Sequence, residues 1–236
     1  MAKNKNMAKI SNDFLEGFIK NNNATTLKMM FYIAKSSLEV TKGDLMTFGI
    51  NVKDMCSYCN IDVKTLRRSF KAMSETSVTI TRDDGVRYIS LIPYVDIRYN
   101  GELEVKMFKE VLDELIAVKN RFTIIDVSNV MRFKSKHSLK MIQLVERING
   151  YSDNVAKRKH YTLDDLNALF GVNYKRLLDV ERKVIQPAKR ELDQYSKISF
   201  IYRLEYDKDD ITTPGRAKAV SLVLDVVRNT PQPLLF

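Results

Sequence analysis

The stretch YKRLLDVERKVIQPAKREL, residues 174–192, is the most informative part of this chain about its fold. On a helix at about 100° per residue, it places apolar side chains on one face and basic side chains on the other. A short helix over 163–170 precedes it, because Thr162 opens that helix with a capping-box spacing and Gly171 closes it. With Asn173 as the expected N-cap of the basic helix, the two helices and their turn predict a helix-turn-helix, whose second helix enters a DNA major groove. The inward face of the basic helix is expected to hold Tyr174, Leu177, Leu178, Val184, Ile185, Ala188 and Leu192.

A second helix-turn-helix pattern occurs in the first half of the chain. A short helix is expected over 52–58 and a longer one over 63–73, with Asp62 as the N-cap of the longer helix. Superposing the two patterns without gaps places Asp62 on Asn173, a constant offset of 111 residues that is typical of a tandem duplication. In the longer helix, the side chains expected to face inward are Val63, Leu66, Phe70 and Met73, and those expected to face outward are Lys64, Arg67, Arg68 and Lys71.

Segments rich in β-forming residues follow each basic helix. The first helix is followed by three such segments, at 78–81, 86–99 and 102–108. The second helix is followed by two, at 198–206 and 218–227. Because a helix-turn-helix followed by a β-hairpin is a winged helix, we expect an α+β fold with two tandem winged-helix domains. The expected divisions are a flexible leader at 1–9, an N-terminal domain at 10–119, a C-terminal domain at 120–228 and a tail at 229–236.

The charge of the chain is strongly positive and unevenly distributed. Its 39 Lys and Arg outnumber its 29 Asp and Glu, which gives a formal net charge of +10. Residues 131–190 alone hold 14 basic and 6 acidic side chains, so this quarter of the chain contributes most of the excess. Such a focused basic patch favours a polyanionic partner such as DNA. Since no apolar run approaches the roughly 20 residues of a membrane span, we expect a cytoplasmic protein without membrane contact.

The sequence offers no set of residues for catalysis or for a cofactor. Cys56 and Cys59 form one CxxC pair, but no second Cys or His pair lies at zinc-finger spacing. The two histidines, His137 and His160, lack the clustered partners that a metal-dependent nuclease needs. Neither a phosphate-binding P-loop nor a dinucleotide fingerprint is present. We therefore expect no catalytic residue, no metal ion, no cofactor and no enzyme activity.

An ordered series of motifs covers about residues 120–225. Its first part consists of FT at 122–123, FKSKHS at 133–138 and the helix 139–148, which look like "FT … KSKYS … LYELL" of a known family. Residues 161–166 with Gly171 look like that family's "sleeLk … Lg", and Gly215 with Arg216 look like its "GR". Its "Y … d-rrV-pA" is matched by Tyr174, Asp179, Arg182, Lys183, Val184, Ile185, Pro187 and Ala188. In this series the chain resembles plasmid replication initiator proteins of the iteron-binding Rep type.

The resemblance implies a function in starting plasmid DNA replication. Initiators of this family bind iterons, the short direct repeats of a replication origin, as monomers, open the duplex and load host replication proteins, including the host initiator and helicase. As dimers, held through the first domain, they bind an inverted operator and repress their own gene. The implied partners are therefore double-stranded DNA, a second copy of the chain and host proteins in the bacterial cytoplasm. The alternatives are a two-domain winged-helix transcriptional repressor and a nicking relaxase.

The position of a basic side chain indicates whether it can contact DNA bases or DNA phosphates. Arg and Lys near the exposed first turns of a basic helix can reach guanine, whereas basic residues elsewhere are suited to phosphate. The candidates for base reading are Arg176, Arg182, Lys183 and Lys175 in the second domain and Arg67 and Arg68 in the first. The candidates for phosphate binding are Lys134, Lys136, Lys157, Arg158, Lys159, Arg216, Lys64 and Lys71. For 157–159 the alternative is a solvated loop between helices, and at Pro187 we expect a bend in one long helix.

Overall fold

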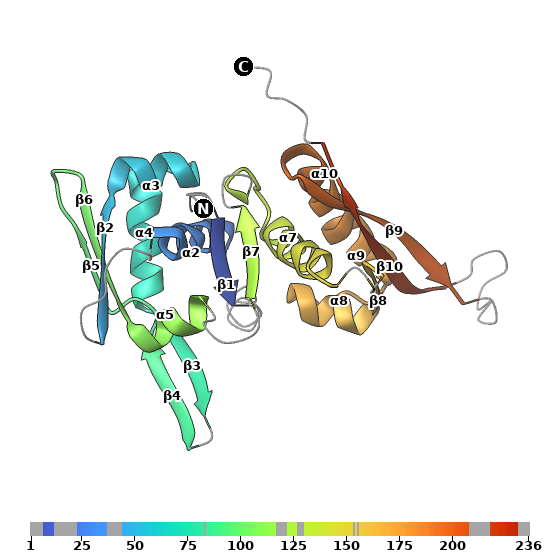
Figure 1. Cartoon of the computed structure of the whole chain (residues 1–236), viewed down its shortest axis with the longest axis horizontal. Helices are drawn as coiled ribbons and strands as arrows, with labels where there is room; N and C mark the ends of the chain where they lie inside the picture. Colours follow the sequence, from blue (N-terminus) through green and yellow to red (C-terminus); the bar gives the residue numbers. More distant parts are fainter. Residues whose placement is uncertain are drawn as a thin grey trace. The chain divides into compact units, whose positions relative to one another are not determined.

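The chain folds into two compact units, each with its own helices and sheet (Figure 1). The computed structural model describes residues 7–11, 23–36, 44–82, 84–116, 122–126, 130–152, 154, 156–207 and 218–230. The first unit extends to Arg132, and the second begins at Phe133.

The first unit is built around a helix-turn-helix and a three-stranded antiparallel sheet. Its elements are α2 (Ala24–Ser36), β2 (Leu45–Asn51), α3 (Val52–Cys59), α4 (Val63–Ser74), β5 (Tyr94–Ile97), β6 (Glu102–Phe108) and α5 (Lys109–Ile116), with strand order β2-β6-β5. Alternate residues of the strands, such as Phe48 on β2 and Val105 on β6, are buried against the helices. Phe31 of α2 and Phe70 of α4 are also buried, so one apolar core holds the sheet and the helices together.

A separate two-stranded hairpin, β3 (Ser77–Arg82) with β4 (Gly85–Ser90), follows α4 in the first unit. The β-rich segment predicted over 86–99 holds two strands, because the chain leaves β4 at Ser90 and starts β5 at Tyr94. Between them, the N–H of Leu91 bonds to the carbonyl of Thr76 at 2.9 Å, and Leu91 and Ile92 enter the core. Burial of these two side chains turns the chain from one sheet to the other.

The first unit also contains a strand pair that joins its two ends. Strand β1 (Met7–Ser11) runs antiparallel to β7 (Phe122–Asp126), with Met7 opposite Asp126. The flexible leader predicted at 1–9 thus includes strand residues, and the predicted boundary near residue 120 lies too early. Pairing between segments so far apart in sequence leaves no local pattern from which the boundary could be read.

The second unit has the same plan of helix-turn-helix and three-stranded sheet. Its elements are α7 (Lys136–Asn149), β8 (Arg158–Thr162), α8 (Leu163–Phe170), α9 (Leu177–Val180), the π-helix η1 (Glu181–Ile185), α10 (Gln186–Tyr195), β9 (Ile198–Tyr206) and β10 (Ala219–Arg228), with strand order β8-β10-β9. Phe200 on β9 and Leu222 on β10 are buried beneath α7 and α10.

The end of the second unit is tied to the C-terminal end of α10. The side-chain amide of Asn229 donates hydrogen bonds to the carbonyls of Asp193 at 2.8 Å and Ser196 at 2.7 Å. These carbonyls at the helix end would otherwise lack partners. Asn229, the first residue of the predicted tail, therefore belongs to the folded unit. Among the described residues, no helix is long and apolar enough to cross a membrane.

Candidate nucleic-acid interface

The basic stretch of the second unit forms one helix over 177–195, made of α9, η1 and α10. Val180 and Gln186, which border the π-helical turn, both have right-handed helical backbone angles. The N–H of Gln186 bonds to the carbonyl of Glu181, five residues earlier, which is the widened π pattern. Pro187 lacks an N–H and crowds the turn before it. The wider turn accommodates this ring, so Pro187 neither breaks the helix nor starts a separate one.

The start of this helix differs from the prediction. It begins at Leu177 with Arg176 in the N-cap position, whereas the predicted start was Tyr174 with Asn173 as cap. The side chain of Asn167 on α8 holds Tyr174 in the turn, because its Oδ1 accepts the Tyr174 N–H at 3.0 Å and its Nδ2 donates to the Tyr174 carbonyl at 2.9 Å. The offset between the two helix-turn-helices is 111 residues for the first helices, α3 and α8, and 114 for the starts of α4 and α9.

The later start changes which side chains face outward. Leu178 was predicted to face inward, but it is 48% exposed. Val63, in the first turn of α4, was also predicted to face inward and is 42% exposed. An exposed apolar side chain at the start of a basic helix is suited to contact the methyl group of thymine. Leu178 and Val63 are candidates that the helical periodicity of the sequence missed. Leu178 faces outward because its helix starts later than predicted, whereas Val63 is exposed in the first turn of a helix that starts at the predicted residue.

Three of the basic residues predicted to read bases already have partners within the second unit. Two arginines lie beside the carboxylate of Asp179, and one lysine lies over the ring of Tyr174. Arg176 donates to Asp179 from Nε at 2.9 Å and from Nη2 at 3.1 Å, while Nη2 of Arg182 lies 3.5 Å from Asp179 Oδ1. The Arg176 hydrogen bonds, more than any other cause, hold the pKa of Asp179 below its ordinary value. The Nζ of Lys183 lies 5.1 Å from the centre of the Tyr174 ring, a cation–π distance. Lys175, the fourth, is exposed in the turn.

Lys134 and Lys136 lie at the beginning of α7. The carboxylate of Glu191 on α10 accepts the backbone N–H groups of Lys134 at 3.1 Å and Ser135 at 3.4 Å. Ser135 is the N-cap of α7, and its hydroxyl accepts the N–H of His137 at 3.1 Å. Two lysines beside a helix N-terminus are suited to an anion. Glu191 thus connects the basic helix to the segment that carries these candidate phosphate contacts.

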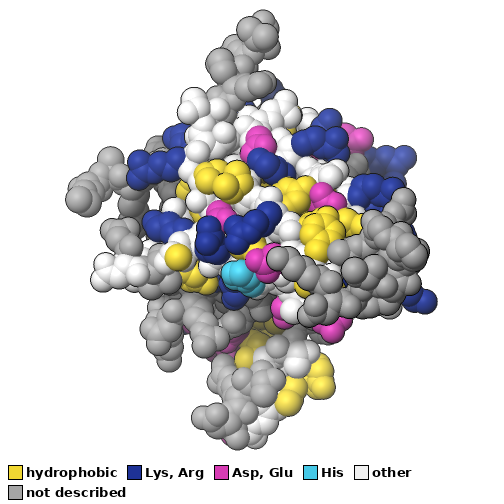
Figure 2. Space-filling model, turned by 90° about the vertical axis from the view of Figure 1, so that its right-hand side faces the viewer, with side chains coloured by type: hydrophobic (Ala, Val, Ile, Leu, Met, Phe, Trp, Pro, Cys, Tyr) yellow, Lys and Arg dark blue, Asp and Glu magenta, His cyan; other side chains and the backbone are white. Residues whose placement is uncertain are grey.

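The basic run at 157–159 is not the solvated loop of the alternative interpretation. Arg158 and Lys159 lie in strand β8, and the Lys157 carbonyl accepts the N–H of Val226 at 2.9 Å. Arg158 is paired with Asp225 on β10, which reduces its availability for phosphate. Figure 2, which views the second unit from the right-hand side of Figure 1, shows Lys and Arg side chains spread over that face, with acidic side chains among them. The remaining candidate, Arg216, lies outside the described residues.

The first unit presents its basic residues on α4. Asp62 caps this helix as predicted, and its Oδ1 accepts the N–H of Thr65 at 2.6 Å. Three of the four side chains expected inward are buried, namely Leu66, Phe70 and Met73. The four basic side chains expected outward are all exposed, and within the described part of the chain none of them forms an ion pair: Lys64, Arg67, Arg68 and Lys71.

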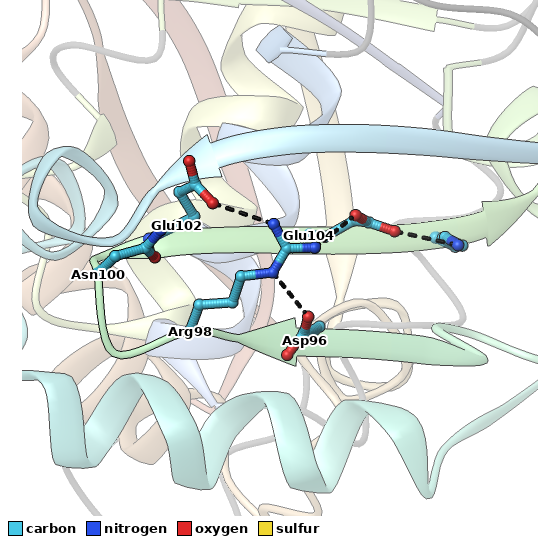
Figure 3. Close-up of polar contacts among 6 residues, drawn as sticks. Asp96, Arg98, Asn100, Glu102 and Glu104 are labelled. Atoms are coloured by element: carbon cyan, nitrogen blue, oxygen red, sulfur yellow. Dashed lines mark hydrogen bonds and ion pairs between the residues drawn. The ribbon is translucent and has the colours of Figure 1, made fainter.

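The hairpin β5–β6 of the first unit has a different charge. Figure 3 shows Arg98 surrounded by three carboxylates, with distances of 3.0 Å to Asp96, 3.0 Å to Glu102 and 3.4 Å to Glu104. These carboxylates repel phosphate and already occupy the guanidinium of Arg98. In the first unit, α4 rather than this hairpin therefore carries the features of a DNA contact.

Comparisons with known proteins agree for both units. The family model for "Initiator Replication protein, WH1" matches residues 7–146, and that for "Initiator Rep protein, WH2" matches residues 162–213. A solved structure, "Crystal structure of Pi initiator protein in complex with iteron DNA", is similar with a TM-score of 0.72 and 16% sequence identity, and the match covers 97% of this chain and 99% of that chain. No curated protein sequence matches significantly.

The family matches confirm the predicted α+β fold of two winged-helix domains. They cover most of the described chain, with the first domain model ending inside α7 and the second beginning at the N-cap of α8. The chain therefore belongs to the family of initiator replication proteins, of which it carries both winged-helix domains, WH1 and WH2, in that order.

Proposed function

We propose that this initiator binds the direct repeats of a plasmid replication origin through two basic helices, α4 in the first unit and the helix over 177–195 in the second. The observation that carries the proposal is that each of these helices is the second helix of a helix-turn-helix and presents exposed basic side chains. The solved structure of similar fold holds an initiator on iteron DNA, which supports the same class of ligand here.

The two kinds of basic residue have different tasks in this proposal. Arg67 and Arg68 on α4, with Arg176 and Arg182 at the start of the second helix, reach base edges, where guanidinium groups pair with guanine. Lys134 and Lys136 hold phosphate at the N-terminus of α7, which supplies affinity and register without sequence preference. The second unit, which holds most of the excess positive charge, binds more tightly.

The further steps of initiation need no chemistry on DNA. We propose that the bound chain opens the duplex, recruits host replication proteins, and represses its own gene as a dimer. Its two histidines lie in different elements, since His137 packs against the ring of Phe170 from α7 and His160 lies on β8. Incubation of the protein with supercoiled origin DNA and Mg²⁺ tests this point, because a relaxase would produce nicked circles and an initiator would not.

The test of DNA binding compares two double variants by footprinting on the cognate origin. Arg67→Ala with Arg68→Ala removes the base-reading candidates of α4, and we expect protection to be lost over one half of each repeat only. Arg87→Ala with Lys109→Ala removes the same charge from elsewhere in the first unit and should leave both halves protected. Unchanged protection in the α4 variant would contradict the proposal for the first unit.

The number of phosphate contacts can be measured separately. If each unit neutralises about four phosphates, the logarithm of the binding constant should fall against the logarithm of salt concentration with a slope on the order of −7. A slope shallower than about −3 would mean that one unit does not lie on DNA.

A further inference from the structure

One carboxylate lies among the basic side chains at the start of the second unit's DNA-binding helix. Asp179 accepts two hydrogen bonds from Arg176, Nε to Oδ2 at 2.9 Å and Nη2 to Oδ1 at 3.1 Å. Its side chain is only 17% exposed, whereas that of Arg176 is 73% exposed. The carboxylate of Asp179 is thus largely covered, and the guanidinium of Arg176 that it binds extends into solvent.

The geometry of this pair leaves one edge of the guanidinium free. A guanidinium has five N–H groups, and the pair with Asp179 uses the side formed by Nε and Nη2. The end formed by Nη1 and the second hydrogen of Nη2 remains available. Two parallel N–H groups on that end match the O6 and N7 acceptors of guanine in the major groove. Arg176 is therefore oriented in advance with the edge that reads guanine pointing away from the helix.

Arg182 is held much less firmly by the same carboxylate. Its single approach to Asp179, from Nη2 to Oδ1, is 3.5 Å, and its side chain is 68% exposed. A flexible Arg must lose more conformational freedom on binding than one that is already held. Both arginines are among the base-reading candidates of the sequence, and the contacts on the helix favour Arg176 over Arg182.

We propose that Asp179 determines specificity in this initiator by orienting Arg176 as the guanine reader of the second unit while repelling phosphate from the start of the helix. The proposal rests on the proposed function of this helix in DNA binding. Asp179 lowers the formal charge of the group that it makes with Arg176 and Arg182 from +2 to +1, so it reduces affinity for any DNA. In return it reduces the conformational freedom that Arg176 loses when it contacts guanine.

If Asp179 lowers affinity for DNA in general and raises discrimination between base pairs, its replacement should change the two quantities in a way that replacement of a purely structural residue would not. Replacement of Asp179 should strengthen binding to unrelated DNA, because a negative charge near the phosphates is removed. It should simultaneously weaken discrimination at one G·C pair of the repeat. A residue that only stabilised the fold would weaken binding to both kinds of DNA when it was replaced.

The experiment measures fluorescence anisotropy of the full chain with three kinds of duplex: the cognate origin repeat, versions with each G·C pair changed in turn, and an unrelated sequence. For Asp179→Ala we expect affinity for the unrelated duplex to rise about threefold. We also expect discrimination at one G·C pair to fall about tenfold, within the range of a bidentate guanine contact. Asp164→Ala, which removes a carboxylate from an exposed position on α8, is the control and should leave discrimination unchanged.

Double variants identify the arginine through which Asp179 acts. Arg176→Ala should abolish discrimination at the same base pair, and adding Asp179→Ala to it should cause no further loss there. If Asp179→Ala retains full discrimination, or if the affected base pair responds to Arg182→Ala instead, the proposal is wrong. Asp179→Asn keeps the shape of the side chain and is used if circular dichroism shows that the alanine variant is unfolded. A wild-type chain that binds all duplexes equally would contradict the proposed function itself.

Discussion

The hydroxyl group of Tyr202 on strand β9 donates a hydrogen bond of 2.8 Å to Oε1 of Glu181, the first residue of the π-helical turn. Nε2 of Gln186 donates to the same oxygen at 2.9 Å from the far side of that turn. Glu181 therefore connects the sheet of the second unit to both ends of the widened turn that precedes Pro187. A strand of the β9–β10 hairpin thus contacts the basic helix at its π-helical turn.

Loss of the Tyr202 hydroxyl should loosen this turn. We expect Tyr202→Phe to lower the free energy of unfolding by about 1 kcal/mol, because Glu181 loses a hydrogen bond. It should also weaken binding to the cognate repeat more than binding to unrelated DNA. Urea denaturation and anisotropy measure the two effects. Tyr206→Phe, at an exposed position of the same strand, is the control, and equal losses in both variants would contradict the role of Tyr202.

The same contact predicts sensitivity to alkaline pH. Burial first, and then the bond to Glu181, raise the pKa of Tyr202 from the ordinary value of about 10 to about 12. Because the folded state holds this proton more tightly, its contribution to stability is complete below pH 10 and is lost as the pH rises from 10 through 12. Urea denaturation at pH 9 and pH 11 should show a smaller decrease for Tyr202→Phe than for wild type. Tyr58, whose pKa burial also raises to about 12, contributes in the same direction in both proteins.

Asn167 should be important for presenting the basic helix, although it carries no charge. Asn167→Ala removes both hydrogen bonds to the Tyr174 backbone, and we expect a loss of about 1–2 kcal/mol in the free energy of unfolding. Asn167→Asp keeps the acceptor for the Tyr174 N–H and removes the donor, so it should lie between wild type and the alanine variant. The measurement is thermal denaturation of the full chain. An alanine variant as stable as wild type would show that the turn holds without Asn167.

The N-cap of α4 should make the first unit sensitive to acid. Hydrogen bonds from Thr65 hold the pKa of Asp62 below its ordinary value. For a carboxyl with a lowered pKa, the stabilising contribution is present above the unfolded pKa, near 4, and is lost as the pH falls through the folded pKa. Asparagine also caps helices but does not titrate in this range. Asp62→Asn should therefore lose less stability than wild type between pH 5 and pH 2, as measured by urea denaturation, and identical curves would contradict this assignment.

The features that the sequence predicted well depend on residues close together in the chain. Asp62 and Thr162 are predicted as caps from their residue type and position before a helix. In the structure each accepts a hydrogen bond from the backbone N–H three positions later. The buried faces of α4 and of the later helix follow from the helical period, and Leu66 and Val184 are buried as expected. The motif series in the second half indicated the family because short segments follow one another in the family's order.

The features that the sequence did not predict depend on partners that are distant in the chain or on the exact start of a helix. Strand β1 could not be recognised without β7, and the late start of the second basic helix depends on Asn167 holding Tyr174. The pairing of the charged side chains on that helix could not be predicted either. Periodicity places Asp179 near Arg176 and Arg182, but it does not show which arginine the carboxylate holds.

Two winged-helix domains and the basic character of their second helices follow from local sequence patterns, because helical period, capping and turn residues act over a few positions. The start of the second basic helix, the accommodation of Pro187 and the pairing of the basic groups depend instead on the folded arrangement of the unit. These outcomes depend on contacts such as Tyr202 with Glu181, and Arg158 with Asp225, that join strands and helices across the unit. Such contacts form only when the chain has folded, since a hydrogen bond or ion pair is set by distance in space and not by distance along the sequence.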